Sequence, residues 1–458
     1  MCGIIGIHSN IKNKHIFYEI FEGLMCLQHR GQDSVGISNE HSVKKYDGLV
    51  KYAFQSENIS DLLCQNYMGH VRYGTNGLSN DIQPFYSIFP RRISLCHNGN
   101  ITNTKEIKEM IYEKYHILID TQSDSEIILS IFSCKLYELL HNDTNIISDD
   151  KIYWVINFLH EVLEGSYSLL IIIKDYGMIS IRDKRGIRPL IYGKKDNNYI
   201  IASESVALNL LNYKIIRDLM PGESIIFKNN TSDPIFHYYQ DSFLTPCLFE
   251  YIYFARPDSI IDNINVNEAR IKIGNLLGTL IKKSWSHYTD IDYIIPVPDT
   301  SITFANGIQE ELNIPLREGF IKNRYIDRTF IMKNKNIIQQ NIKRKLSGIE
   351  NSFKDKNVLI VDDSIVRGNT CKHVISMVKN YGCKKIYFAS CSPVIKNTNK
   401  YGIYIPTRKE LISFKRNEEE IRKELQVDYL IYNDLDKIIA CLKELNNKIK
   451  NFEISMFL

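Results

Sequence analysis

The segment at residues 358–370, which reads V-L-I-V-D-D-S-I-V-R-G-N-T, restricts the fold more than any other part of the chain. Four consecutive apolar residues, three of them β-branched, predict a strand that is buried on both faces. Two adjacent aspartates follow, and a short glycine-containing loop then leads into a helix. Because ligands of open α/β sheets bind at the carboxyl ends of the strands, this order predicts a parallel sheet with a binding site at that edge.

Helices and strands alternate on both sides of this segment. The apolar spacing predicts helices over residues 267–284, 301–312 and 371–381, and strands over residues 292–297 and 385–389. Such a βαβ rhythm favours a parallel sheet with helices on both faces. Residues 321–348 interrupt the rhythm: they are rich in Lys, Arg, Asn and Gln and lack an apolar stripe, which predicts a functional loop.

The first half of the chain has a different pattern. Short apolar segments predict strands at residues 2–7, 167–174, 177–182 and 199–202, and a helix is expected over residues 15–28. The length of 458 residues allows about two or three domains. We therefore expect a strand-rich domain over residues 2–235 and a parallel α/β domain over residues 250–458.

Composition argues against several functional classes. With 57 basic and 53 acidic residues the net charge is only +4, so no nucleic-acid-binding surface is expected. The chain lacks an apolar run of the roughly 20 residues that a membrane helix needs, and its start does not resemble a secretory signal. None of the ten cysteines forms a C-x-x-C pair, which disfavours a zinc ribbon and a disulfide framework and favours a reducing cytoplasm.

Cys2 directly follows Met1, and a small residue at this position normally permits removal of the initiator. The resulting α-amine titrates at a pH of about 7.7–8.0 and a thiol at about 8.5, so the amine can act as the base for its own residue's thiol. A cysteine at position 2 is by itself more often incidental. Four polar segments elsewhere in the first half, however, fit one chemistry together with it: residues 29–34, 69–73, 96–100 and 123–126.

These segments offer the groups that binding and hydrolysis of an α-amino-acid amide require. Arg72 offers a guanidinium for bidentate capture of an α-carboxylate, and Asp124 offers a carboxylate for an ammonium. Asn98 and Gly99 offer a side-chain amide and a backbone N–H for an oxyanion. Each feature alone is common, since an H-N-G-N sequence is more often a turn, but the combination is specific.

Together with Cys2, these motifs resemble the class II glutamine amidotransferases, N-terminal-nucleophile hydrolases that release ammonia from glutamine. The resemblance covers nearly all of residues 2–235. It implies a four-layer αββα sandwich, in which two antiparallel sheets are stacked between helical layers. By position, Cys2 is the nucleophile, and Asn98 with Gly99 forms the oxyanion hole.

The same resemblance implies which residues bind glutamine. Arg72 and Asp124 would hold its carboxylate and its amine, while Arg30 and Gly31 would help to position the N-terminus. Gly74 and the shortened stretch of residues 75–83 depart from the usual loop that follows Arg-Tyr.

The segment 358–370 resembles the phosphoribosylpyrophosphate-binding motif of type I phosphoribosyltransferases, whose core is a parallel α/β sheet. The likeness implies that Asp362 and Asp363 contact the ribose hydroxyls. The residues that would surround the 5′-phosphate are Ser364, Ile365, Val366, Arg367, Gly368, Asn369 and Thr370. Residues 298–301 look like the pyrophosphate loop, in which Thr300 would bind one Mg²⁺ per subunit together with the two aspartates.

Both halves together resemble the glutamine phosphoribosylpyrophosphate amidotransferases, over about residues 2–457. Residues 247–259 resemble the inter-domain signature of that family. Residues 322–345 resemble its mobile loop, with Lys322 and Arg324 binding phosphoribosylpyrophosphate. The resemblance implies that glutamine, phosphoribosylpyrophosphate and water become 5-phosphoribosylamine, glutamate and pyrophosphate, the first committed step of purine biosynthesis.

The resemblance further implies a homotetramer that purine nucleotides inhibit. Some relatives carry an iron–sulfur cluster, but residues 399–401 and the C-terminal region lack the further cysteines that would join Cys247, so no cluster is expected. Two alternatives stay open at this point. The chain could be another class II amidotransferase, which would share Cys2 and Asn98, or a catalytically silent regulator that binds phosphoribosylpyrophosphate.

Overall fold

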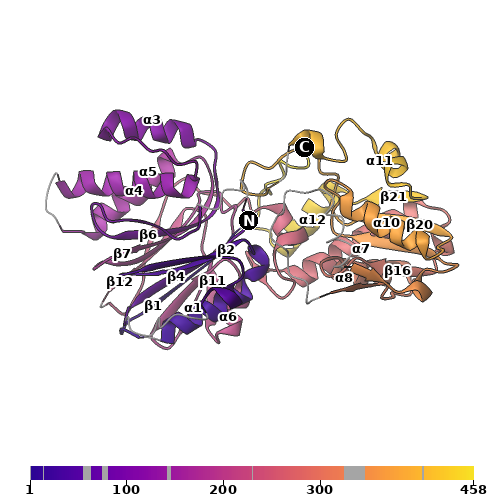
Figure 1. Ribbon diagram of the computed structural model, residues 1–458, viewed down its shortest axis with the longest axis horizontal. Helices are drawn as coiled ribbons and strands as arrows, with labels where there is room; N and C mark the ends of the chain where they lie inside the picture. The colour runs from indigo at the N-terminus through magenta and orange to yellow at the C-terminus, as the bar shows by residue number, and fades with distance from the viewer. Residues whose placement is uncertain are drawn as a thin grey trace.

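The computed structural model describes residues 2–13, 15–54, 63–74, 81–141, 146–229, 231–323, 346–404 and 407–458. The chain forms two lobes, and its N-terminal end lies where the two lobes meet (Figure 1). Within the described ranges, no helix has both the length and the apolarity that crossing a membrane requires.

Two antiparallel sheets lie face to face in the first lobe. The first sheet has the strand order β11 (Lys214–Asp218), β9 (Ile191–Lys195), β10 (Asn198–Ala202), β1 (Gly3–Ser9), β4 (Asn66–Arg72), β2 (Ser34–Asn39) and β3 (Val43–Asp47). The second has the order β13 (Ile235–Tyr238), β12 (Glu223–Lys228), β8 (Gly177–Arg182), β7 (Gly165–Ile173), β6 (Ile93–Ile101) and β5 (Phe85–Ser87). Apolar side chains from both sheets, such as Ile4 and Leu170, fill the space between them.

Helices cover the outer face of each sheet (Figure 1). The helices on the first sheet are α1 (His15–Cys26), α2 (Val50–Ala53) and α6 (Ser205–Leu210), and those on the second are α3 (Thr104–Tyr115), α4 (Asp124–His141) and α5 (Asp149–Val162). Alternate side chains of a strand face opposite sides. On β1, Ile5 and Ile7 therefore pack against helices while Ile4 faces the other sheet. These layers confirm the predicted αββα sandwich.

The second lobe is built on a parallel sheet. Its strand order is β16 (Tyr293–Pro296), β19 (Asn357–Asp362), β20 (Lys385–Ser390) and β21 (Tyr429–Tyr432). On β19, Leu359 and Val361 pack with α7 (Val266–Ser284), α8 (Ser301–Leu312) and α12 (Leu435–Leu445). Val358 and Ile360 pack with α10 (Asn369–Asn380) and α11 (Glu418–Leu425). Burial on both faces explains the unbroken apolar sequence of β19 and confirms the predicted α/β sheet.

Element boundaries differ from the predictions by a few residues. Helix α8 has the predicted bounds, whereas α10 begins at Asn369, two residues early, directly after the left-handed Gly368. The ends of the predicted loop pair as an antiparallel hairpin of β17 (Phe320–Lys322) and β18 (Leu346–Gly348). Residues 324–345, and with them Arg324, lie outside the described residues.

The segment between the lobes packs against both of them. Cys247 N donates to Ile187 O of the first lobe, and Leu248 N donates to Glu453 O of the second, each at 3.2 Å. A short π-helical turn, η3 (Glu250–Phe254), follows. The hairpin of β14 (Ile260–Ile261) and β15 (Ile264–Asn265) then leads into α7. The predicted domain boundaries at residues 235 and 250 stay predictions.

Candidate active sites

Cys2 lies directly before β1, which is flanked by β10 and β4 within the first sheet. Its backbone N donates to Asn98 Oδ1 at 3.2 Å, and its carbonyl accepts from Arg30 Nε at 3.0 Å. Asn98 comes from β6 of the other sheet and is fully buried. Both backbone polar atoms of Cys2 are therefore held by side chains.

Four of the residues predicted for the glutamine site line one cavity of about 220 Å³: Cys2, Arg72, Gly99 and Asp124. Arg72 ends β4 and Gly99 lies in β6, so the two sheets each supply a wall. Arg72 Nη2 donates to Asp81 Oδ2 at 3.4 Å. The guanidinium thus already faces a carboxylate, the group that it is predicted to bind.

Gly31 lies against the backbone of Arg72. A Cβ at Gly31 would stand 2.4 Å from the carbonyl carbon of Arg72, so this close approach requires glycine. Asp33 N also donates to Arg72 O, at 3.0 Å. The segment that contains Gly31 therefore fixes the end of β4, from which the Arg72 side chain reaches the cavity.

Asp124 begins α4 and pairs with His97. His97 Nδ1 lies 3.6 Å from Asp124 Oδ2, and Ile101 N donates to the same oxygen at 3.1 Å. Burial raises the pKa of the Asp124 carboxyl, but His97 and the hydrogen bonds together hold that pKa below its ordinary value. Burial lowers the pKa of His97, yet Asp124 raises it above normal overall. The carboxylate is thus kept ionised beside the cavity, as binding of an ammonium group requires.

Three residues of this wall had no predicted role: His97, Gln83 and Ser125. Gln83 Oε1 accepts from His97 N at 2.6 Å, and Gln83 Nε2 donates to Ser125 Oγ at 3.0 Å. His97 and Ser125 are sequence neighbours of the predicted site residues Asn98 and Asp124, and this proximity could have indicated a role for them. Gln83 lies outside all the motifs and carried no signal.

Arg30 is fully buried beneath Cys2, between two carboxylates. Nη1 donates to Glu204 Oε1 at 2.5 Å, and Nη2 donates to Glu250 Oε1 at 2.8 Å. Burial raises the pKa of the Glu204 carboxyl, but His29 and Arg30 together hold that pKa well below its ordinary range. Glu204 lies outside the motifs, and Glu250 had no predicted role within residues 247–259.

Asp362 ends β19 at the carboxyl edge of the parallel sheet, and Asp363 follows it. Asp363 N donates to Asp362 Oδ1 at 3.0 Å, and Ser364 Oγ donates to Asp363 Oδ1 at 2.7 Å. Among the residues that the structure describes, no lysine or arginine forms an ion pair with either aspartate. Burial raises the pKa of both carboxyls, and the charge of Asp363 raises that of Asp362 further. The charge of Arg270 lowers the pKa of Asp363 in part, and the two adjacent carboxylates keep an excess of negative charge that fits a divalent cation with oxygen ligands.

The chain after Asp363 forms a loop that ends in α10. Gly368 has a φ of +77° and precedes the first helical residue, Asn369. Backbone N–H groups at a helix N-terminus bind phosphate well, and the role of residues 364–370 stays a prediction. Arg367 instead pairs with Glu410, at 3.2 Å between Nη2 and Oε2.

Thr300 and Lys322 lie at the same edge of the sheet. Val297 N donates to Val361 O at 2.9 Å, so the loop of residues 298–300 begins beside the end of β19. Thr300 directly precedes α8. Lys322 Nζ lies 2.5 Å from Asp299 Oδ2, which ties β17 to this loop.

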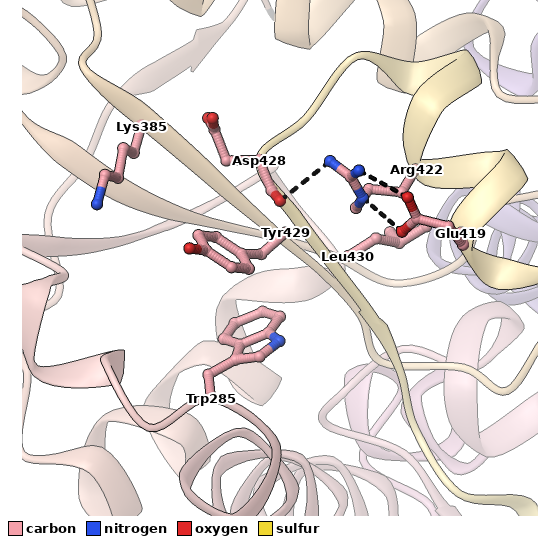
Figure 2. A pocket seen from close by; sticks show the side chains of 7 residues that line it. All are labelled: Trp285, Lys385, Glu419, Arg422, Asp428, Tyr429 and Leu430. Carbon is pink, nitrogen blue, oxygen red and sulfur yellow. Dashed lines mark hydrogen bonds and ion pairs between the residues drawn. The ribbon is translucent and has the colours of Figure 1, made fainter.

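A larger hollow, of about 470 Å³, lies elsewhere on the second lobe (Figure 2). Two of its lining residues, Lys385 and Tyr429, begin β20 and β21, so the hollow is at the amino edge of the sheet, opposite Asp362. Arg422 in its wall donates to Glu419 through Nε and Nη2, both at 2.7 Å (Figure 2). We place the second site at the carboxyl edge because the chemistry-bearing residues gather there.

Each lobe matches a different known protein domain. Residues 70–210 match the glutamine amidotransferase domain, and residues 265–400 match the phosphoribosyl transferase domain. Amidophosphoribosyltransferase of Escherichia coli (strain K12) is 41% identical over 476 residues, which cover 100% of this chain and 92% of that protein. The enzyme of the same name from Saccharomyces cerevisiae is 39% identical over 472 residues, covering 100% and 91%. The chain belongs to the amidophosphoribosyltransferase family.

Solved structures agree with this membership. The glutamine phosphoribosylpyrophosphate amidotransferase from B. subtilis, complexed with ADP and GMP, matches with a TM-score of 0.83 and 31% identity, over 98% of this chain and 94% of that one. A structure described as the allosteric regulatory enzyme of purine biosynthesis has the same TM-score and identity, over 96% and 91%. The chain is thus a glutamine-dependent pentosyltransferase of purine biosynthesis, as its sequence predicts, with one domain for each half of the reaction.

Proposed function

We propose that Cys2 is the nucleophile that hydrolyses glutamine. Once Met1 has been removed, the Cys2 amine takes the thiol proton, and the thiolate attacks the amide carbon of glutamine. The C–N bond breaks, the nitrogen leaves as ammonia, and water hydrolyses the γ-glutamyl thioester to glutamate. The position of Cys2 in one cavity with Arg72, Gly99 and Asp124 supports this role.

One observation carries this proposal. Within the described residues, Asn98 Nδ2 is buried and has no hydrogen-bond partner, although Oδ1 of the same amide accepts from Cys2 N. A buried donor without an acceptor is costly and rare in folded proteins. An oxyanion that forms beside Cys2 would supply the missing acceptor, with the Gly99 N–H as the second donor.

Substrate binding in this site follows from charge. Arg72 would bind the α-carboxylate of glutamine in place of Asp81, and Asp124 would bind the α-ammonium group. Arg30 and Gly31 would act indirectly, through the residues that they position. Arg30 donates to the Cys2 carbonyl, and Gly31 lies against the Arg72 backbone.

We assign the second half of the reaction to the carboxyl edge of the parallel sheet. Asp362 and Asp363 would bind the ribose hydroxyls and, with Thr300, one Mg²⁺ per subunit. When bound, Mg²⁺ neutralises charge on the departing pyrophosphate. Residues 364–370 would hold the 5′-phosphate, and Lys322 and Arg324 the pyrophosphate. Ammonia then attacks the anomeric carbon as the bond to pyrophosphate breaks, which gives 5-phosphoribosylamine.

Ammonia has to cross from one lobe to the other. Gly402 of the second lobe lines the Cys2 cavity, so the glutamine site is closed in part by the lobe that uses its product. Transfer between the lobes without exchange with water keeps ammonia neutral and reactive. The predicted closure of residues 322–345 over this path lies largely outside the described residues.

The wider setting is also a proposal. We propose a cytoplasmic homotetramer that purine nucleotides inhibit. The complex of the B. subtilis enzyme with ADP and GMP supports nucleotide binding, and ten unpaired cysteines support a reducing compartment. The alternative of a silent regulator is disfavoured because Cys2, Gly99, Arg72 and Asp124 line one cavity.

Replacement of the nucleophile tests the assignment. We expect Cys2→Ala to abolish pyrophosphate release with glutamine and to retain it with ammonium as the nitrogen source. Cys383→Ala, which alters another partly exposed cysteine, is the control and should keep both activities. Normal glutamine-dependent turnover in Cys2→Ala would refute the assignment.

A further inference from the structure

We propose that Glu250, in the turn between the lobes, positions the nucleophile and the oxyanion hole at the same time. The inference deepens the proposed function and rests on the role given there to Cys2 and Gly99. Glu250 begins η3 and is 1% exposed. Its carboxylate faces one arginine from each side of the glutamine site.

The first arginine connects Glu250 to the nucleophile. Glu250 Oε1 accepts from Arg30 Nη2 at 2.8 Å, and Oε2 accepts from Arg30 Nη1 at 3.2 Å. The third donor of the same planar guanidinium, Nε, holds the Cys2 carbonyl at 3.0 Å. Because the guanidinium is rigid, the carboxylate that orients one edge also sets the direction of the other.

The second arginine connects Glu250 to the backbone that faces Gly99. Arg188 Nη1 lies 3.4 Å from Glu250 Oε1, and Arg188 Nε donates to Tyr401 O at 3.0 Å. Tyr401 belongs to a second-lobe segment that lies against the oxyanion glycine. A Cβ at the next residue, Gly402, would stand 2.9 Å from Gly99 O.

Through the two arginines, the Glu250 carboxylate positions both the nucleophile and the oxyanion glycine. Without the charge of Glu250, Arg30 retains Glu204, whereas Arg188 retains the carbonyl of Tyr401 and, within the described residues, no carboxylate. The Cys2 carbonyl and the segment that faces Gly99 are then no longer positioned by the same carboxylate. Glutamine itself is held elsewhere, by Arg72 and Asp124, so turnover should suffer more than binding.

The test is Glu250→Gln, with kcat and KM measured for glutamine and for ammonium. A displacement of catalytic groups by about 1 Å can cost 100-fold, so we expect kcat with glutamine to fall about 10- to 100-fold. We expect KM for glutamine and the rate with ammonium to change by less than about twofold. Glu250→Asp, which keeps the charge, should restore part of kcat.

Asp262→Asn is the matched control. Asp262 is 4% exposed and receives two hydrogen bonds from the buried Arg182, at 2.7 and 2.9 Å, but it does not contact Cys2 or Gly99. It should lower the melting temperature as Glu250→Gln does, without changing the ratio of the glutamine rate to the ammonium rate.

An unchanged ratio in Glu250→Gln, or an equal change in both variants, would overturn the positioning role. If Glu250→Gln does not fold, Arg188→Met, which removes the link from Glu250 to the Tyr401 carbonyl, is compared with Asp262→Asn instead, and an unchanged ratio has the same meaning. Retention of glutamine turnover in Cys2→Ala is a separate result, which would refute the proposed function instead.

Discussion

The proposed glutamine site and the proposed phosphoribosylpyrophosphate site differ in how their charged residues are partnered. Around Cys2, buried charges face protein partners: Arg30 lies between Glu204 and Glu250, and His97 faces Asp124. At the edge of the parallel sheet, Asp362 and Asp363 lie side by side; burial raises the pKa of both carboxyls, and the charge of Asp363 raises that of Asp362 further.

This difference indicates how each site reaches its working state. A site with internally paired charges is organised before substrate arrives, which suits a nucleophile that must be held in place. A site with an excess of negative charge is neutralised only when it binds a cation together with its ligand. The first site should therefore lose stability when a charge is removed, and the second should lose activity but not stability.

The largest effect on stability is expected for Arg30→Met. This change leaves Glu204 and Glu250 buried with fewer partners, and breaking a buried pair costs about 3–5 kcal/mol. Urea unfolding measures the loss. Arg256→Met, which alters an ion pair that is 40% and 56% exposed, is the control and should cost less than about 1 kcal/mol. Equal losses in both variants would contradict the view that internal pairing stabilises the first site.

The largest effect on synthesis is expected for the double variant Asp362→Asn and Asp363→Asn. Loss of both charges removes the proposed ribose and Mg²⁺ ligands, so synthesis with ammonium should fall about 100- to 1,000-fold. Pyrophosphate release measures this rate. Glutamate release in the same preparation should persist, because Cys2 lies in the other lobe. Normal synthesis with ammonium would show that the carboxyl edge is not the second site.

A smaller effect is expected for Asp124→Asn. A hydrogen bond to a charged group contributes about 1.5–3 kcal/mol, so KM for glutamine should rise roughly 10- to 100-fold. Steady-state kinetics at saturating phosphoribosylpyrophosphate measure it, and the rate with ammonium serves as the internal control. An unchanged KM would remove Asp124 from the glutamine site.

The smallest predicted effect is a gain in stability instead of a loss. In protein freed of Mg²⁺ by a chelator, Asp362→Asn should raise the free energy of unfolding at neutral pH, since it removes a carboxylate whose pKa is raised by burial and by Asp363. The gain should vanish below a pH of about 4, where the carboxyl is protonated in both the folded and the unfolded chain, grow as pH rises from the unfolded toward the folded pKa, and level off above the folded pKa. Thermal unfolding across this pH range measures it. A destabilised variant at neutral pH would contradict the comparison.

Local chemistry made much of this molecule predictable. The unbroken apolar run of β19 predicts a strand buried on both faces, and the aspartates after it predict the sheet edge that carries the second site. Arg72, Gly99 and Asp124 are far apart in the sequence but could be grouped because each suits one part of the same substrate. Their roles stay predictions, although the structure brings them to one cavity with Cys2.

Contacts between distant segments were not predictable. Glu204 and Glu250 meet Arg30 across 174 and 220 residues, and neither glutamate has a periodicity or a neighbouring motif that points to such a partner. Gln83 and Gly402 line the glutamine site, and neither position could be predicted from the sequence. The early start of α10 depended on the left-handed Gly368, since the apolar spacing of the helix does not extend to it.

The contact between Cys2 N and Asn98 Oδ1 ties catalysis to maturation of the chain. The nitrogen that is proposed to act as the base is an amide, and has no basicity, for as long as Met1 remains attached. Each molecule would thus be synthesised without glutamine-dependent activity and be switched on once, by a peptidase, and the glutamine-dependent specific activity of a preparation would be proportional to the fraction of chains trimmed. Intact-mass measurement together with an active-site titration would test that proportionality. An affinity tag fused before Cys2 would abolish the glutamine-dependent activity.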